Sequence, residues 1–476
     1  MKKEIFFDKL KIFIGLEIHI TVNSEKKIFN LSKNYKEKIS PNKNIGKWEL
    51  GYLGVLPIIN FQVIEKALKL ANSLNMKINE TIIFDRKIYN YPDLSKGYQI
   101  TQKEKVFATS GYFDVIDEEK KITVPIKSIH LEEDTAKIIY SKDEIFLDFN
   151  RSGNPLIELV TDPIFSDIKK LINFIKQLRT LLIYLDISDS KMEMGQIRID
   201  INYSLIIDNI YFTPRYEIKN LNSLNNIEIC LEEEIKKHYI FFSQNLSPPI
   251  SQTMKFDEKK KKTFFSREKK EYYFIPEINI PPIKLKKKQI KNCKKKLPII
   301  PSILWKKIIK KTKINNINKL INNVDLIKLI SIIFKKKIIS EKNINFFINF
   351  YLFFLSPEFN FYDINNLLSN KKNFLFVFNL FKKKKINKNN LKEFIKSLDN
   401  KKTNKKFFLL DNKKINKKIF FHYLEKIWIE EKFNNSIEIK KIKNFFLGRM
   451  KKIFHNFSIK KIVENVDYFL NQKTKN

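Results

Sequence analysis

Several residue types are scarce in this sequence, and each scarcity excludes a class of protein. Only 2 of the 476 residues are cysteines, and Cys230 and Cys293 stand too far apart for a metal-binding or redox motif, so we expect free thiols in a reducing compartment. No stretch reaches the roughly 18 uncharged apolar residues that a membrane-spanning helix requires. Acids and lysines interrupt the apolar start of the chain, which argues against a signal peptide. We therefore expect a cytoplasmic protein that makes no membrane contact.

Common signatures of nucleotide and zinc sites are missing as well. The sequence contains neither a GxxxxGK[ST] loop nor a GxGxxG motif, so a nucleotide would be held by neither common phosphate cradle. The 5 histidines, at positions 19, 130, 238, 422 and 455, show no zinc-ligand spacing, and the two thiols are isolated. The sequence therefore predicts no zinc site.

Positive charge is abundant and unevenly distributed. The net charge is +39, yet residues 1–250 carry 35 Lys and Arg against 34 Asp and Glu, whereas residues 251–476 carry 56 against 18. A background bias toward lysine would charge both halves alike, so the asymmetry favours a polyanionic partner for the second half. Nucleic acid is the first interpretation, and surface lysines without a partner are the alternative.

Glycine divides the chain at a similar place. Eight of the 9 glycines lie in the first 195 residues, which indicates a turn-rich part that contains β-strands. Alternation of apolar and polar residues predicts strands at 11–20, 127–134, 144–150 and 196–205. Helical spacing predicts helices at 62–76, 166–186 and 225–242.

The later part of the sequence has a helical pattern. A proline-rich segment at 274–285 leads into a lysine-rich stretch, and from about residue 300 apolar residues recur at helical spacing, with a break near 398–417. We find no internal repeat. We therefore predict an α+β protein with three domains: a mixed or antiparallel β-sheet domain at residues 1–290, an all-α helical domain at 291–405 and a small helical tail domain at 406–476.

Three of the predicted strands carry acids on one face, because alternate residues of a strand point to the same side. The sets that share a face are Glu17 with His19, His130 with Glu132 and Asp134, and Arg198 with Asp200 and Asn202. An ordinary solvent-exposed face would favour Lys, Thr and Ser, and this lysine-rich chain has none of them at these positions. The pattern therefore favours a functional site, and the outer face of a half-exposed sheet is the alternative.

Clustered carboxylates suit Mg²⁺, a hard cation that takes carboxylate and water oxygens together with substrate phosphates. A neighbouring arginine would offset the charge of a phosphoryl group during its transfer. The three faces therefore suit a magnesium ion that is bound together with substrate phosphates.

Nine segments between residues 14 and 283 form an ordered series. They are IGLEIHI (14–20), GVLPIIN (54–60), FDRKIYNYPDLSKGYQITQ (84–102), IHLEEDTAK (129–137), LDFNRSGNPLIELVTDP (147–163), KMEMGQIRIDIN (191–202), EIKNLNS (217–223), SQTMKFDE (251–258) and YYFIPEINIPPI (272–283). In this order they resemble the motifs of the B subunit of tRNA-dependent aspartyl/glutamyl-tRNA amidotransferases. FFLGRMKKI (445–453) and VENVDYFL (463–470) resemble the end of the small helical tail domain of that family.

The resemblance implies ATP-dependent amidation of a misacylated tRNA, with the first domain as a catalytic cradle and the basic second half as the tRNA-binding part. ATP would phosphorylate the side-chain carboxylate of Glu on tRNA(Gln) or Asp on tRNA(Asn), and ammonia would displace the phosphate. The family forms a heterotrimer, in which an amidase A subunit supplies ammonia and a small C subunit completes the assembly. This sequence agrees, since neither cysteine has a histidine partner nearby and no Ser/Lys amidase signature is visible.

The resemblance also assigns roles to individual residues. It implies metal ligands at Glu17, His19, Glu132 and Glu133, and alternation favours Glu132 over its neighbour. It implies catalytic roles for Glu17, His19, Lys87, Glu132, Glu193, Arg198 and Asp200, with Arg198 or Lys87 near phosphate. It implies cofactor contacts at Arg198, Asn202, Asn150 and Arg151, and bracing of a turn is the alternative for the last two. The sequence departs from the family pattern at Met194 and Gln196.

Two other functions compete with this prediction. One is a non-catalytic RNA-binding protein, against which the retained Glu17, His19 and Asp200 argue. The other is a stand-alone ATP-dependent ligase that uses free ammonia. The sequence leaves open whether the substrate is Glu-tRNA(Gln), Asp-tRNA(Asn) or both.

Overall fold

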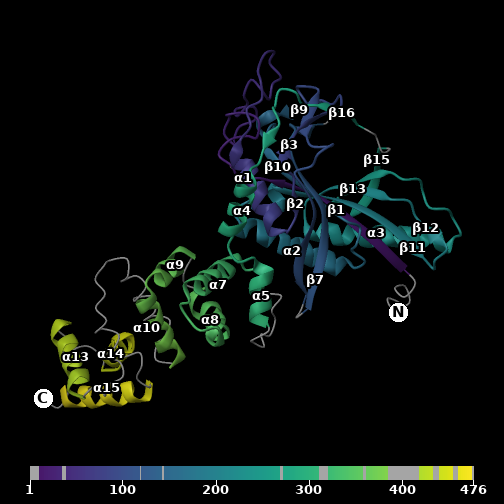
Figure 1. Ribbon diagram of the computed structural model, residues 1–476. Helices are drawn as coiled ribbons and strands as arrows, with labels where there is room; N and C mark the ends of the chain where they lie inside the picture. Colours follow the sequence, from purple (N-terminus) through teal and green to yellow (C-terminus); the bar gives the residue numbers. More distant parts are fainter. Residues whose placement is uncertain are drawn as a thin grey trace. The chain divides into compact units, whose positions relative to one another are not determined.

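The computed structural model describes residues 10–34, 39–117, 120–141, 144–267, 272–309, 320–356, 361–383, 417–431, 439–453 and 459–473. The chain forms two compact units, residues 1–345 and residues 346–476 (Figure 1). Within the described residues the first unit combines sheets with helices and the second consists of helices, so the predicted α+β class is confirmed. The predicted domain boundaries stay predictions, since position 290 falls within a helix and position 405 lies outside the described residues.

A ten-stranded sheet is the frame of the first unit. Its strands are β1 (Leu10–Thr21), β2 (Lys77–Ile78), β6 (Ala108–Asp117), β7 (Lys120–Glu133), β10 (Pro155–Thr161), β11 (Ile197–Ile207), β12 (Tyr211–Phe212), β13 (Tyr216–Leu221), β14 (Thr253–Asp257) and β15 (Lys262–Arg267). They lie in the order β15-β14-β13-β11-β1-β10-β7-β6-β2, and β12 pairs with β11. Only the pair β13–β14 is parallel among the described strands, so the sheet is mixed, as predicted. The first described strand, β1 (purple in Figure 1), therefore lies in the interior of the sheet.

Helices cover the apolar face of this sheet. Ile14, Leu16 and Ile18 of β1 are buried on that face. α2 (Ile168–Tyr184) packs through Phe174 against Phe113 of β6, and α3 (Leu224–Ser243) packs against β11 and β13. Together with α1 (Phe61–Ser73), these helices confirm the three that helical spacing predicts.

The predicted strands are confirmed too, with one addition. The segments at 11–20, 127–134 and 196–205 fall in β1, β7 and β11, and the segment at 144–150 forms β9 (Ile145–Asp148) and the 3₁₀ turn η1 (Phe149–Arg151). The addition is β10, which lies between β1 and β7. Its sequence, PLIELVT, is apolar at most positions and therefore shows little of the alternation that identifies a half-exposed strand.

Smaller sheets stand beside the main one. They consist of β4 (Asp85–Ile88), β5 (Tyr98–Thr101) and β16 (Tyr273–Pro276); of β3 (Thr81–Ile82) and β17 (Ile283–Lys284); and of β8 (Lys137–Tyr140) and β9. The first of them is joined to the end of β7, where the backbone N–H of Ile100 donates to Glu133 Oε1 at 3.0 Å and Gln99 Nε2 donates to the Glu133 carbonyl at 2.6 Å. This junction brings β4 toward the polar side of the main sheet.

Three more helices complete the described first unit: α4 (Lys287–Lys296), α5 (Pro301–Ile309) and α7 (Val324–Lys336), followed by the 3₁₀ turn η3 (Glu341–Asn343). The hydroxyl of Tyr184 joins them to α2, since it lies 3.0 Å from both the Ile299 carbonyl and Ser331 Oγ. The proline-rich boundary segment is thus extended and is followed by helices that still belong to the first unit.

The second unit is helical where it is described. α8 (Ile344–Phe350) begins just before it, followed by the π-helix η4 (Tyr351–Leu355), α9 (Phe361–Ser369) and α10 (Lys371–Lys382), and Phe347 and Phe350 are buried against Phe374 and Phe378. α13 (Lys417–Glu430), α14 (Ile439–Ile453) and α15 (Ile459–Lys473) share a second core, to which ten buried side chains among the described residues belong. This core contains Phe446, Val466 and Phe469, which belong to the two predicted tail segments. The predicted break at 398–417 lies almost entirely outside the described residues.

The structure bears on two predictions, one about the two cysteines and one about membrane-spanning helices. Cys230 and Cys293 are both free thiols. Burial raises the pKa of Cys230 to about 12, so this thiol stays protonated at neutral pH. In the described ranges, no helix combines the length and the apolar character needed to cross a membrane.

A buried lysine anchors the segment between β1 and α1. Lys27 is fully buried, and its Nζ donates to the carbonyls of Ser152 at 2.6 Å and Asn44 at 3.0 Å and lies 4.0 Å from Glu49 Oε1. Gly153, in the turn that receives Lys27, has φ +78°, and a Cβ there would lie 2.8 Å from Glu49 Oε1, so only glycine fits. Burial lowers the pKa of Lys27 to about 8, although Glu49 and Glu133 oppose this effect.

The anchor predicts a pH dependence of stability. Wild-type protein should gain stability relative to Lys27→Met between pH 8 and pH 10.5, because over this range the unfolded lysine binds the proton that the folded one releases. Below pH 8 the lysine is charged in the folded protein, and the cost of burying this charge opposes folding in full. Above pH 10.5 the lysine is neutral in both the folded and the unfolded protein, so the cost no longer applies. The relative gain is on the order of 3 kcal/mol, measurable by urea unfolding of both proteins across the range. A difference that stays constant or falls as pH rises would contradict the buried charge.

Candidate active site

Polar side chains from neighbouring strands meet on the face of the main sheet opposite α2 and α3. In the register of β1 and β11, Glu17 lies opposite Asp200 and His19 lies opposite Arg198. On the other side of β1, His19 lies opposite Glu158 of β10. The predicted polar faces of β1, β7 and β11 thus belong to one surface, and β10 supplies the link between β1 and β7.

Two histidines and two glutamates form one group on this surface. His19 Nδ1 lies 3.0 Å from Glu132 Oε1 and 3.9 Å from Glu158 Oε2. His130 Nε2 lies 2.8 Å from the same Glu158 oxygen. Glu132 is almost completely buried, and Glu158 is largely so. The group therefore alternates basic and acidic side chains in a place with little access to water.

The charges of this group stabilise one another. Burial lowers the pKa of His19, but Glu158 and Glu132 outweigh that effect and raise the pKa to about 9. For Glu158 burial acts in the opposite direction and raises the pKa, but His130 and His19 outweigh burial and lower the pKa well below its usual range. At neutral pH an imidazolium therefore lies between two carboxylates.

A second group on the same face is rich in carboxylates. One oxygen each of Glu17, Asp200 and Glu217 can be chosen so that all three lie within 4.8 Å of one another. Lys219 Nζ lies 3.1 Å from Asp200 Oδ2 and 2.7 Å from Glu217 Oε1, and Asn202 Nδ2 donates to Glu17 Oε1 at 3.0 Å. Burial, followed by the negative charge of Glu158, raises the pKa of Glu17. Asp200 and Glu217 share Lys219, and three carboxylates this close together are suited to binding a hard cation.

Two arginines approach a third acid beside these groups. Arg198 Nη2 lies 3.0 Å from Asp134 Oδ2, and Arg151 Nε lies 3.4 Å from the same oxygen. Arg198 Nε is buried and has no hydrogen-bond partner within the described residues. An arginine with a spare buried donor is suited to an anionic oxygen of a substrate.

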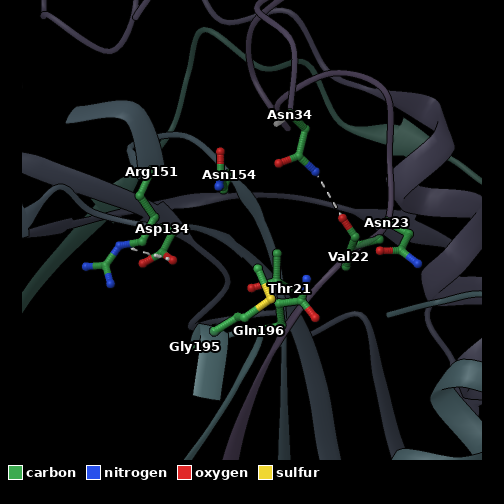
Figure 2. A pocket seen from close by; sticks show the side chains of 10 residues that line it. Thr21, Val22, Asn23, Asn34, Asp134, Arg151, Asn154, Gly195 and Gln196 are labelled. Carbon is green, nitrogen blue, oxygen red and sulfur yellow. Dashed lines mark hydrogen bonds and ion pairs between the residues drawn. The ribbon is translucent and has the colours of Figure 1, made fainter. Parts of the chain in front are cut away.

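A small pocket opens beside Asp134 and Arg151 (Figure 2). Its volume is about 110 Å³, and its lining residues are Thr21, Val22, Asn23, Asn34, Asp134, Arg151, Asn154, Met194, Gly195 and Gln196. Figure 2 shows the ion pair of Arg151 and Asp134 on one side, with Asn34 reaching the Val22 carbonyl on the other. Asn154 Oδ1 is buried and lacks a hydrogen-bond partner in the part of the chain that the structure describes. The pocket can therefore hydrogen bond a compact polar group.

Most of the residues that the sequence singles out come together here. The ones on the shared face are Glu17, His19, Glu132, Arg198, Asp200 and Asn202, with Arg151 at the pocket. Lys87 of β4 approaches from the small sheet: its Nζ lies 4.3 Å from the centre of the Tyr272 ring, and its charge lowers the pKa of Glu158.

Three predicted residues have other surroundings. Glu133 points away from the shared face, where Lys96 Nζ lies 2.7 Å from its Oε1. Asn150 Oδ1 accepts from the backbone N–H groups of residues 43 and 44 at 2.9 and 2.8 Å, which braces the loop before α1. Glu193 is exposed in the 3₁₀ turn η2 (Met192–Met194). The structure therefore does not bring these three into either carboxylate group.

The structure adds residues that the sequence prediction left out. Glu158 stands alone in an apolar run, and Glu217 and Lys219 alternate with apolar residues in a strand of only six residues. The available signal was the alternation of Glu217, Ile218 and Lys219 in the EIKNLNS segment, which has the same form as that of β1.

Known proteins resemble this chain mainly over its first unit. The profile of the family described as GatB/GatE catalytic domain matches residues 12–291. This chain is also similar to three proteins named as the B subunit of aspartyl/glutamyl-tRNA(Asn/Gln) amidotransferase. It is 39% identical to the one from Ureaplasma parvum over 289 residues, 35% to the one from Mesoplasma florum over 323 residues and 37% to the one from Mycoplasmopsis agalactiae over 327 residues. The alignments cover 59%, 66% and 67% of this chain and 60%, 67% and 68% of the relatives. The chain thus spans less than two thirds of the length of the Ureaplasma protein.

Proposed function

The chain belongs to the GatB/GatE catalytic domain family, and on that premise we propose that it is the B subunit of a tRNA-dependent amidotransferase. Its reaction would convert Glu on tRNA(Gln), Asp on tRNA(Asn) or both into the corresponding amide at the expense of ATP. The observation that supports this most strongly is the meeting of Glu17, Asp200 and Glu217 on one sheet face that also carries the partly buried side chain of Arg198. Carboxylates for a cation next to a cation for phosphate are what a phosphoryl-transfer site requires.

Mg²⁺ fits the carboxylate group of Glu17, Asp200 and Glu217. The group offers three carboxylate oxygens within 4.8 Å of one another, two of its members contact Lys219, and burial, followed by the charge of Glu158, raises the pKa of Glu17. Hard oxygen donors of this kind suit Mg²⁺. Bound there, Mg²⁺ would supply positive charge to the phosphates of ATP.

His19 and Glu132 form the other proposed metal-binding group, together with Glu158. Here the proton on His19 already balances the carboxylates, so a metal ion would have to displace it. We therefore propose Glu17, Asp200 and Glu217 as the principal ligands. His19 and Glu132 would lie beside them, and Glu133, held by Lys96, would not be a ligand.

The proposed chemistry has two steps. A carboxylate is a poor electrophile, so its oxygen first attacks the γ-phosphorus of ATP and ADP leaves. Ammonia then attacks the carbonyl carbon of the acyl phosphate, loses a proton and displaces inorganic phosphate, which leaves the amide. Arg198 Nε has no hydrogen-bond partner among the described residues, and the charge of Lys87 acts on Glu158, so both side chains can offset negative charge on the transferring group.

Other parts of the proposal concern partners. The relatives are named as B subunits, which supports assembly with an amidase A subunit that releases ammonia from glutamine and with a small C subunit. The excess of positive charge in residues 251–476 supports contacts with the tRNA backbone.

An amidation assay with two nitrogen sources tests the function. The purified chain with ATP, Mg²⁺ and misacylated tRNA should form the amide when ammonium chloride is supplied, but not when glutamine is supplied alone. Addition of the A and C subunits should make glutamine effective. Release of the amino acid from the tRNA, followed by chromatography, measures the product on Glu-tRNA(Gln) and Asp-tRNA(Asn) separately.

Three outcomes would change the proposal. Binding of tRNA without amide from either nitrogen source would favour a non-catalytic RNA-binding protein. Use of glutamine by the chain alone would contradict the need for an A subunit. Amide formation from ammonium chloride that the A and C subunits never couple to glutamine would favour a stand-alone ligase.

A further inference from the structure

An uncharged segment exposes a row of large apolar side chains in the first unit. Residues 50–64 include no Asp, Glu, Lys or Arg, although such residues make up 30% of the chain. The exposed apolar side chains of this segment are Leu50, Tyr52, Leu53, Leu56, Ile58 and Phe61, and Leu53 is completely exposed. Single exposed apolar residues are ordinary, but six within twelve positions mark an interaction surface.

The backbone of this segment is fixed in place. The N–H of Ile58 donates to the Phe29 carbonyl at 2.9 Å, and that of Asn60 donates to the Ile28 carbonyl at 2.8 Å. The side chain of Asn60 also caps α1, where its Oδ1 accepts from the N–H of Gln62 at 3.0 Å. These bonds tie the exposed segment to the loop that Lys27 anchors, so the apolar side chains are presented by a fixed backbone.

The segment begins close to the candidate active site. Gly51 has φ +70°, and a Cβ built there would lie 3.2 Å from the Ser95 carbonyl and 3.4 Å from the Lys96 side chain. Glu49, which directly precedes the segment, reaches the turn that carries Arg151 and Asn154 of the pocket, since a Cβ built at Gly153 would lie 2.8 Å from Glu49 Oε1. A partner that covers this segment would therefore stand at the rim of the site.

Charge identifies the kind of partner. The segment offers no cation to a nucleic acid, whose backbone is bound through Lys and Arg. A second copy of this chain would bring a net charge of +39 against another +39, which opposes self-association. The surface that remains complementary is an uncharged, apolar face of a different protein.

We propose that residues 50–61 form the docking surface for the glutamine-hydrolysing subunit that supplies ammonia. This inference rests on the proposed function and assigns the contact to a segment. Ammonia must pass between the proteins without loss to solvent, and apolar side chains at the junction exclude water from that passage.

A single substitution tests the contact. Leu53→Asp places a charge in the middle of the segment at a fully exposed position, so the fold of the chain should be unaffected. Ile210→Asp is the matched control, since Ile210 is also a strongly exposed apolar residue. It follows the last residue of β11, whereas Arg198 lies at the start of that strand. Binding of both variants and of wild type to the purified A subunit, carrying the C subunit, is measured by calorimetry.

Leu53→Asp should weaken binding at least about tenfold, since a charge buried in an apolar contact is not compensated. Glutamine-dependent amidation should fall in parallel, while tRNA binding and amidation with ammonium chloride should match wild type. Ile210→Asp should leave all four measurements unchanged. An affinity of Leu53→Asp within about twofold of wild type would overturn the docking surface.

Other occupants give different results. Loss of a self-associated state in Leu53→Asp, seen by sedimentation, would assign the segment to a second copy. Loss of binding to phosphatidylglycerol vesicles would assign it to a membrane. Either result would overturn the proposal. Absence of amidation by wild type with ammonium chloride would count against the proposed function alone, because the calorimetric comparison of the three proteins does not depend on catalysis.

Discussion

Replacement of Glu17 by Ala is expected to abolish ATP-dependent amidation and to leave tRNA binding intact. Glu17 is the central-strand member of the carboxylate group with Asp200 and Glu217, and loss of one such group lowers rates by about 100- to 10,000-fold. The capture of tRNA is proposed for residues 251–476, far along the chain from Glu17. Single-turnover amidation with ammonium chloride measures the first effect, and filter binding measures the second.

The isosteric change Glu17→Gln separates charge from packing. The amide still offers an oxygen to Asn202 Nδ2, which lies 3.0 Å from Glu17 Oε1 in wild type, so the local structure should persist. The ionised form of Glu17 is disfavoured by burial and by Glu158, so the melting temperature of this variant should not fall below that of wild type. Glu228→Gln is the matched control, because Glu228 is exposed on α3 at the opposite face of the sheet. Amidation at the wild-type rate in Glu17→Gln would refute the site assignment.

Deletion of residues 410–476 is expected to weaken tRNA binding and to flatten its dependence on salt. The deletion removes α13, α14 and α15 together with the core that they share among the described residues. The removed segment carries 16 Lys and Arg against 7 Asp and Glu. Each phosphate contact contributes about one unit to the slope of log affinity against log salt. Titration of binding between about 50 and 200 mM salt measures both effects, and we expect a loss of at least about tenfold at the lower salt.

A full-length variant distinguishes charge from the loss of the bundle. Lys440, Lys441, Lys451 and Lys452 can be changed together to Gln, which leaves the ion pairs of Lys443 with Asp467 and of Arg449 with Glu431 untouched. The salt slope should become shallower, while amidation with saturating tRNA and ammonium chloride should keep its wild-type rate. If affinity and slope stay as in wild type in both variants, the positive charge of the tail reflects a background bias in composition.

The sequence predicts the parts of the fold whose pattern is local. Alternation in 11–20 and 196–205 is clear because β1 and β11 each have one buried and one polar face, so a period of two appears in the sequence. The same pattern places Glu17 with His19 and Arg198 with Asp200. It also separates Glu132 from Glu133, since neighbours in a strand point to opposite faces. In the structure Glu133 forms an ion pair with Lys96.

The pairing of strands is not encoded in any local pattern. β10 lies between β1 and β7, and its pairing with β1 joins residues more than a hundred positions apart. Glu158 therefore looks like an isolated acid in an apolar run until the register places it opposite His19 and His130. The roles of Lys87, Glu193, Asn150 and the metal ligands remain predictions, because they depend on bound groups.

The interior position of β1 determines when the site can form during synthesis. β1 is made before the other described strands, yet its neighbours are β10 and β11, so Glu17 meets Asp200 only after residue 200 has been made. At the usual rate of chain growth, roughly 5–20 residues per second, this delay is on the order of ten seconds or more. During that time a strand with exposed backbone and aliphatic side chains has no native partner, which makes it a segment that chaperones would have to protect. Nascent chains that stop before β11 would therefore lack Asp200 and Glu217, two of the three members of the carboxylate group.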